Sequence, residues 1–430
     1  MNETSIKFKR TKFACYASYF TMSSIFSMPP LLFVTFREMY GISYTLLGTL
    51  VLTNFFTQLA VDLIFTAFSK HFNVKWILRV MPLITFFGLM VYALSPFIFP
   101  NSVFVGLVIG TVIFSVSAGL SEVLLSPTIA AIPSKTPERD MSLLHSLYAF
   151  GFVTVVLITT VYLRIFGTHN WMYLAMFFAF LPVVAAALFM MSPIPDMSSG
   201  GKVETDGAVK KQTLGLALCV ACIFFGSCAE TVMSNWISSY TENALQVDKA
   251  LGDILGMAMF AILLGLTRLA YGKLGKSITP VLFIGMAGAA MCYIIVALSG
   301  NPVIAFISCI LTGAFTAMLW PGALIFMEKN VKGAGVGAFA LMASGGDFGA
   351  ALSPQLMGIV ADSVAASDFA VKYSASLGLT CEQVGMRAGM LLTALFPMLG
   401  IVALVIATRY FANQSLHIST KKEKNNVKSR

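Results

Sequence analysis

The chain contains few charged residues for its length. Only 11% of its 430 residues are Asp, Glu, Lys or Arg, whereas about a quarter of the residues in a soluble domain are charged. Hydrophobic residues make up 57% of the chain, and the mean hydropathy is +0.84. This composition excludes a soluble globular protein and indicates an integral membrane protein.

The sequence also lacks the motifs of several common chemistries. It contains no HExxH, no GxSxG and no metal-spaced group of His and Cys, so we expect no metal, no cofactor and no enzyme activity. Residues 272–277 resemble a phosphate-binding loop, but Ala270 stands where that loop requires a glycine. The sequence therefore gives no support for ATP-driven transport.

Apolar stretches of roughly 20 residues or more fill most of the chain, which is the length that crosses a bilayer as a helix. The sequence predicts an all-α bundle of twelve transmembrane helices in two sets of six. These expected spans are 10–36, 44–68, 76–97, 102–132, 142–166, 170–191, 213–240, 250–272, 278–299, 302–327, 334–362 and 386–411. A linker rich in Gly, Ser and charge separates the sets. We expect a first bundle at 1–192, the linker at 193–212, a second bundle at 213–411 and a basic tail at 412–430.

The basic residues are distributed unevenly over the expected loops. With both termini on the cytoplasmic side, 22 of the 28 Lys and Arg lie on that side and five on the other, while Arg268 lies within a span. Lys and Arg in short loops favour the cytoplasmic side. We expect a multi-pass protein of the cell membrane, and among cell membranes we favour the inner membrane of a bacterium. Topology accounts for the net charge of +9 without a nucleic-acid partner.

The two sets of spans resemble each other in sequence. Gly119, Glu122 and Pro127 in the fourth span recur at identical spacing as Gly313, Thr316 and Pro321 in the tenth. A parallel duplication of six helices predicts a pseudo-two-fold axis along the membrane normal and a substrate pathway between the halves.

Ionisable residues inside apolar spans are functional candidates, because an unpaired charge in a bilayer costs several kcal/mol. Four acids satisfy this condition: Asp62, Glu122, Glu230 and Asp347. Some of them could instead be buried structural partners, and for Asp62 this alternative is as good as a cavity position. Arg268 could pair with one of the acids, or its long side chain could extend to the membrane surface.

Other polar and aromatic residues are candidates for substrate contact. Asn54, Gln58 and Asp62 are spaced four residues apart on the second span, so they share one helix face. His145 and Tyr148 lie at the start of the fifth span. Their side chains could form a proton relay, contact a sugar or simply be solvated. A tryptophan ring can cover the apolar face of a sugar. The substrate-binding candidates are Asn54, Gln58, His145, Tyr148, Asn235, Trp320 and Gln355.

These residues resemble a known family, the major facilitator superfamily, and within it the fucose permease branch of sugar:proton symporters. Residues 119–127 resemble that branch's span-four signature, whose glutamate is a proton-coupling residue, and this position is Glu122 here. Residues 225–230, 318–321 and 143–151 resemble its seventh, tenth and fifth spans. In the fifth span, amide side chains line the cavity at the positions of His145 and Tyr148. The branch has an aspartate in span one that is absent here, where Pro30 stands.

The sequence thus predicts a secondary transporter that works by alternating access between two repeated bundles. The expected cargo is a small polar solute, a monosaccharide, carried with protons by a monomer. Glu122 would bind a proton in the outward-facing state and release it to the cytoplasm, because an apolar environment disfavours its charged form. Two alternatives stay open: proton-coupled efflux of an amphipathic compound, and a membrane receptor or scaffold that transports nothing.

Overall fold

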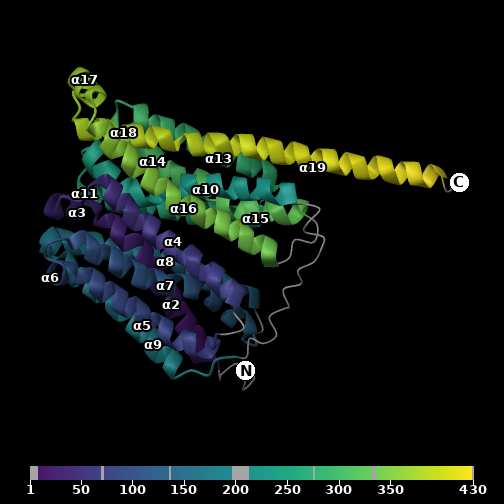
Figure 1. The fold of residues 1–430 in the computed structure, drawn as a ribbon, viewed down its shortest axis with the longest axis horizontal. Helices are drawn as coiled ribbons and strands as arrows, with labels where there is room; N and C mark the ends of the chain where they lie inside the picture. Colours follow the sequence, from purple (N-terminus) through teal and green to yellow (C-terminus); the bar gives the residue numbers. More distant parts are fainter. Residues whose placement is uncertain are drawn as a thin grey trace.

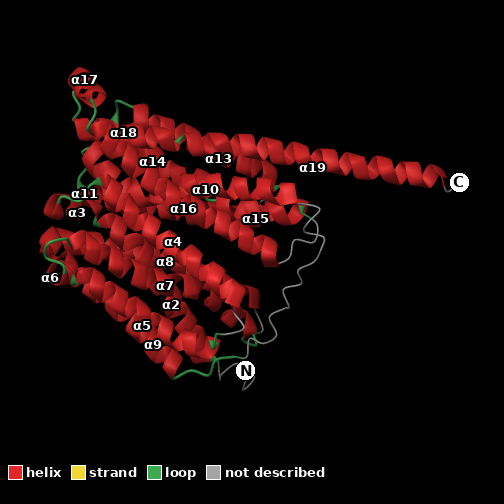
Figure 2. Cartoon of the chain, in the orientation of Figure 1, coloured by secondary structure: helices red, strands yellow, loops and turns green. Residues whose placement is uncertain are grey.

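The computed structural model describes residues 8–68, 72–134, 137–195, 213–274, 277–331 and 336–428. Within these residues the fold consists of helices joined by short loops and contains no strand (Figure 2). The predicted all-α class is confirmed.

The first half of the chain forms the helices α2 to α9. The first expected span is a bent pair, and the third, at 76–97, is divided into a long helix and one further turn. The elements of this half are α2 (Lys9–Leu31), α3 (Phe33–Tyr40), α4 (Tyr44–Phe68), α5 (Val74–Ala93), α6 (Ser95–Ile98), α7 (Val103–Ala131), α8 (Pro137–Phe166), the 3-10 turn η2 (Thr168–Asn170) and α9 (Trp171–Met190).

The second half forms the helices α10 to α19. Two π-helical turns, η4 and η5, interrupt it near the loop between its first two spans. Its elements are α10 (Thr213–Ser239), η4 (Tyr240–Ala244), α11 (Lys249–Leu251), η5 (Gly252–Ala258), α12 (Met259–Leu274), α13 (Ile278–Leu298), α14 (Pro302–Thr316), α15 (Leu319–Asn330), α16 (Val336–Ala365), α17 (Asp368–Leu377), α18 (Cys381–Thr393) and α19 (Leu395–Lys428).

Helices cover all twelve of the expected apolar stretches. Among the described residues, nine helices are long and apolar enough to cross a membrane, and the bent pair α2 and α3 makes ten. The helices α8 and α16 occupy the fifth and eleventh expected stretches but carry more polar side chains. The chain is a multi-pass membrane protein.

The helices lie side by side in one elongated bundle (Figure 1). We call the end near the chain termini the terminal end, and the end with α3, α11 and α17 the distal end. In the first half α2 packs against α8 and α9, and α5 against α7 and α9. In the second half α10 and α18 pack against α16. The main contact between the halves is that of α4 with α16.

Several spans are broken, and proline explains two of the breaks. α2 and α3 meet at a bend of 47° directly after Pro29 and Pro30. The tenth span breaks between α14 and α15, with Pro321 in the first turn of α15. Each proline lacks the N–H that would continue the helix hydrogen bonds. Pro127 and Pro354, in contrast, lie inside the unbroken helices α7 and α16.

The last part of the chain differs from the expected boundaries. The expected single span at 386–411 is divided into α18 and α19 at Ala394, and α19 continues through the expected tail to Lys428. The additional helix α17, which the apolar pattern does not predict, has an N-terminal cap at Ser367 and a left-handed residue, Gly378, at its end. Most of the expected linker, residues 196–212, lies outside the described residues.

The predicted sequence repeat corresponds to equivalent helix crossings. Gly119 of α7 faces Val61 of α4, where an added Cβ would lie 3.0 Å from the valine Cβ. Gly313 of α14 faces Phe260 of α12, where a Cβ would lie 2.3 Å from the carbonyl oxygen. In each half, the glycine therefore lets the fourth span approach the second closely.

Candidate functional site

Polar contacts close the bundle at its distal end. Arg37 of α3 forms an ion pair with Glu382 of α18, with Nε 3.0 Å from Oε1. Its guanidinium also lies over the ring of Tyr44, 4.1 Å from the centroid. The Tyr44 hydroxyl donates to Glu382 and accepts from Asn243 Nδ2 at 2.9 Å. Because Arg37 and Tyr44 belong to the first half, these contacts join the two halves.

Asp362 of α16 caps the start of α4 across the boundary between the halves. Its Oδ1 accepts from the backbone N–H of Tyr44 at 3.2 Å, and its Oδ2 from that of Thr45 at 2.6 Å. The first N–H groups of a helix have no partner within the helix, and the helix dipole favours a negative charge there. A carboxylate of one half therefore completes a helix of the other.

A cavity of about 490 Å³ lies between the halves, on the terminal side of these contacts. Pockets of about 300–1,000 Å³ are typical for small ligands. Side chains from seven spans line it: Tyr19, Met22, Phe26, Phe55, Gln58, Glu122, Ser227, Glu230, Thr231, Ser234, Arg268, Trp320, Pro321, Asp347 and Ala350. Its size and mixed lining suit a small solute with polar groups.

Three carboxylates and one cation face this cavity. Glu122 is exposed to it from α7, and Asp347 is 7% exposed on α16. Glu122 and Asp347 thus bring a carboxylate from each half into the same cavity. Like-charged carboxylates in a poorly hydrated site favour binding of protons or of a cationic group. The acids of both halves thus form one electrostatic cluster.

Glu230 and Arg268 form an ion pair in the cavity wall. Arg268 Nη2 lies 3.1 Å from Oε1 and 3.2 Å from Oε2 of Glu230, and its Nε donates to the Ala317 carbonyl at 2.8 Å. These three bonds direct the Arg268 guanidinium towards Glu230 and Ala317 at the cavity wall, and 40% of the side chain is exposed.

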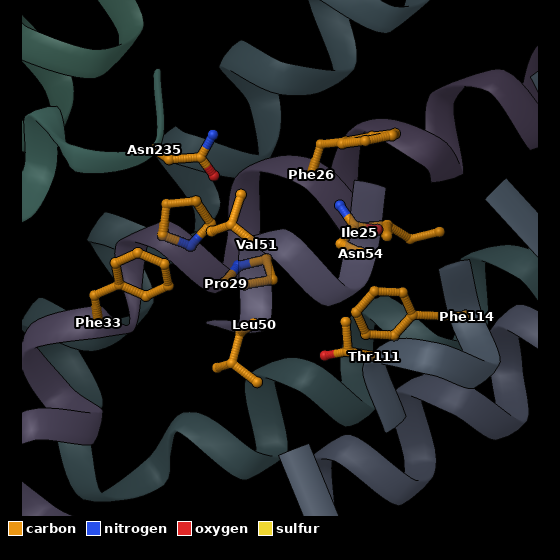
Figure 3. Close-up of a pocket in the computed structure, with 11 residues that line it drawn as sticks. Ile25, Phe26, Pro29, Phe33, Leu50, Val51, Asn54, Thr111, Phe114 and Asn235 are labelled. Atoms are coloured by element: carbon orange, nitrogen blue, oxygen red, sulfur yellow. The ribbon is translucent and has the colours of Figure 1, made fainter. Parts of the chain in front are cut away.

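Amide side chains lie deeper, towards the distal end. Gln58 Nε2 donates to Asn54 Oδ1 at 3.1 Å, and Ser115 Oγ donates to the same oxygen at 2.7 Å. Asn54 and Asn235 lie on opposite sides of a small pocket, with aromatic rings around them (Figure 3). Asn235 donates to the Thr231 carbonyl at 2.9 Å. The small pocket separates the main cavity from the distal contacts.

The structure places the remaining candidates elsewhere. Asp62 lies behind Glu122, next to Gly119, and its Oδ1 is buried without a hydrogen bond among the described residues. Gln355 lies at the contact of α16 with Gly48 of α4 and also has a buried, unpaired Oε1. His145 and Tyr148 belong to α8, but their side chains are outside the described part of the chain.

Several lining residues were not predicted from the sequence. Tyr19, Met22 and Phe26 line the cavity from α2, and Phe55 from α4. The first three follow helical spacing on one face of the first span. That spacing alone does not distinguish a cavity face from a lipid-facing one, because the side chains are large and largely apolar in both cases.

The model of the Major Facilitator Superfamily matches residues 13–354, most of the chain. The chain belongs to this superfamily. The family predicted from the sequence motifs is therefore confirmed, and the protein is a membrane transporter of a fold whose members bind small-molecule substrates. No curated protein matches the chain in sequence.

Solved structures of this superfamily share the fold at low sequence identity. A D-xylose–proton symporter superposes with a TM-score of 0.71 and 15% identity, covering 91% of this chain and 96% of its own. A bacterial homologue of the human lysosomal transporter Spinster, in an inward-facing and unoccupied conformation, gives a TM-score of 0.73 and 14% identity. The superposition covers 96% of this chain and 98% of the homologue.

The Escherichia coli fucose:proton symporter gives a TM-score of 0.58 and 13% identity, covering 93% of this chain and 99% of its own. At this level of identity the likeness of all three structures shows the fold alone.

Proposed function

We propose that the protein is a secondary active transporter that carries a small polar solute together with protons by alternating access. The observation that carries this proposal is the cavity between the halves, in which Glu122 of one half and Asp347 of the other face the same space. Protons bound by these acids would neutralise their mutual repulsion, which links proton binding to the approach of the two halves.

The two halves, residues 1–192 and 213–411, would rock about the cavity while the linker at 193–212 connects them. With the termini in the cytoplasm, as the basic residues favour, the conformation described here is closed to the outside. We propose that the protein acts as a monomer in the cell membrane.

A monosaccharide is the substrate class we favour. Gln58, Ser227, Thr231 and Ser234 supply hydrogen-bonding groups to the cavity, and the Trp320 ring provides an apolar face. Asn54 and Asn235 in the small pocket would contact the substrate only after that pocket joins the cavity. His145, Tyr148 and Gln355 remain proposed contacts in another conformation, and Asp62 a proposed second proton site behind Glu122.

Replacement of Glu122 by glutamine tests the coupling. In reconstituted vesicles with an imposed pH gradient, Glu122→Gln is expected to abolish proton-driven accumulation while exchange of substrate remains measurable. Glu328→Gln is the matched control, because Glu328 is exposed on α15 outside the cavity lining. Accumulation by Glu122→Gln at the level of the parent would contradict the proposal.

Efflux of an amphipathic compound is a second candidate, favoured by a specific feature of the lining. Tyr19, Phe26, Phe55 and Trp320 surround the three carboxylates with aromatic surface, and aromatic rings attract organic cations. Competition separates the two candidates: monosaccharides should inhibit binding to a sugar symporter, and lipophilic cations should inhibit an exporter. A receptor or scaffold would show no flux in either assay.

A further inference from the structure

The break in the tenth span leaves one backbone carbonyl without a helical partner. α14 ends at Thr316 and α15 begins at Leu319, and Pro321 lies four residues after Ala317. Proline has no N–H, so it cannot donate to the carbonyl four residues before it. Ala317 is fully buried, and a buried carbonyl without a partner is costly.

Arg268 of α12 supplies the missing donor. Its Nε lies 2.8 Å from the Ala317 oxygen, while Nη2 of the same guanidinium contacts both carboxylate oxygens of Glu230 on α10. The guanidinium is a rigid planar fork, so the two contacts are geometrically linked. One side chain therefore connects a cavity acid to the break in the tenth span.

The aromatic wall of the cavity begins directly after this break. Trp320 is in the first turn of α15, and its ring lies on Gly346 of α16, where an added Cβ would be 2.2 Å from the ring. Gly346 precedes Asp347. A change in the direction of α15 at Ala317 would therefore move Trp320 relative to the second half's other cavity acid.

We propose that Arg268 is a positioning residue, which couples the ionisation of Glu230 to the position of Trp320 at the cavity wall. An ionised Glu230 accepts two bonds from Nη2. When Glu230 takes up a proton, one oxygen becomes a hydroxyl that donates and the charge attraction is lost. The guanidinium is then free to turn away from Glu230 and from Ala317, and the start of α15 is released.

Other charged groups around Glu230 are few in the described residues. Arg268, Glu122 and Asp347 share the cavity with it. The neighbouring helices α13 and α14 carry no charged residue, and Tyr293 of α13 donates its hydroxyl to the Ala229 carbonyl. The charges of α2, α15 and α19 lie towards the terminal end, whereas those of α18, η4 and η5 lie towards the distal end. Tyr19 of α2 is the further titratable group in the cavity lining.

This inference rests on the proposed proton coupling, because it requires that Glu230, the third carboxylate of the cavity, also takes up a proton, but its test requires no transport. The protein is placed in lipid nanodiscs, and quenching of tryptophan fluorescence by acrylamide is measured over a pH titration. The difference between the parent and Trp320→Phe isolates the signal of Trp320. Trp171 and Trp236 are fully buried, and Trp76, which is 62% exposed, does not belong to the cavity lining.

The Trp320 signal of the parent is expected to change with pH. Glu230→Gln and Arg268→Lys should each abolish this pH dependence, since the first cannot ionise and the second keeps the charge but lacks the planar fork. Glu230→Asp keeps a carboxylate and should retain the dependence, which shows that the loss in the other variants is not a folding defect. Glu122→Gln should also retain it.

Two results would overturn the inference: a pH-independent Trp320 signal in the parent, or an unchanged pH dependence in Glu230→Gln or Arg268→Lys. A failure of the proposed function is recognised by a different result. Glu122→Gln would then accumulate substrate at the level of the parent, independently of the pH dependence of the Trp320 fluorescence. The two proposals are therefore tested separately.

Discussion

Replacement of Asp362 by alanine is expected to weaken the closed distal end and to shift the transporter towards a conformation that is open there. Asp362 accepts from the first two backbone N–H groups of α4, and the helix and the carboxylate belong to different halves. Opening of the distal end must break both bonds. The carboxylate therefore stabilises the closed end and contributes little to the opened one.

The size of the shift follows from the value of a helix cap. Loss of an N-terminal cap costs about 1 kcal/mol, within a range of about 0.5–2 kcal/mol, and a negative charge at a helix N-terminus contributes about 0.3–1 kcal/mol. Together these terms give about 1–2 kcal/mol, which corresponds to a factor of about 5–30 in the ratio of the two conformations. Asp362→Asn keeps an acceptor oxygen without the charge and should give a smaller shift.

A cysteine at position 50 reports on the opening. Leu50 is 3% exposed and lines the small pocket just inside the distal contacts. Six of the native cysteines are buried, and the half-exposed Cys381 is replaced by serine to remove background labelling. The measurement is the rate at which Leu50→Cys reacts with a membrane-impermeant maleimide added from the distal side.

Ser367→Ala provides the matched control. Ser367 caps α17 by accepting from the Ala370 N–H at 3.3 Å, so its loss removes a cap that joins nothing across the halves. In the Ser367→Ala variant, the cysteine at position 50 should react with the maleimide at the same rate as in the parent. If Asp362→Ala also reacted with the maleimide at a rate within about twofold of the parent, the Asp362 cap would not stabilise the closed distal end.

Two glycine substitutions test the helix contacts. A Cβ at Gly358 would lie 2.3 Å from the Tyr44 carbonyl oxygen, so Gly358→Ala should prevent closure of the distal end, abolish transport and increase labelling; normal transport would contradict this. A Cβ at Gly313 would lie 2.3 Å from the Phe260 oxygen, so Gly313→Ala should lower the free energy of unfolding by about 1–3 kcal/mol. Thermal denaturation in detergent measures this, and an unchanged midpoint would count against the close crossing. Gly265 has open space around it, and Gly265→Ala serves as the neutral control for both.

Local sequence was sufficient to predict the long apolar helices and their family, but not the additional helix α17. Apolar stretches of bilayer length leave the backbone no alternative to helix, because no water is available to satisfy its polar groups. The repeat of Gly119 and Gly313 could also be recognised in the sequence, because glycine has no side chain and so permits a close helix crossing at both positions. The four acids were predicted to be functional candidates because each is an ionisable residue within an otherwise apolar span.

Helix packing determines which of these residues come into contact. The partner of Arg268 depends on the rotation of α10 and α12 about their own axes, which spacing within one helix does not determine. The cap that Asp362 gives to α4 joins residues more than 300 positions apart, and no local pattern records such a contact. The amino-acid types alone specify which groups are costly to bury in a bilayer, whereas the packing of the helices specifies which of these groups contact each other.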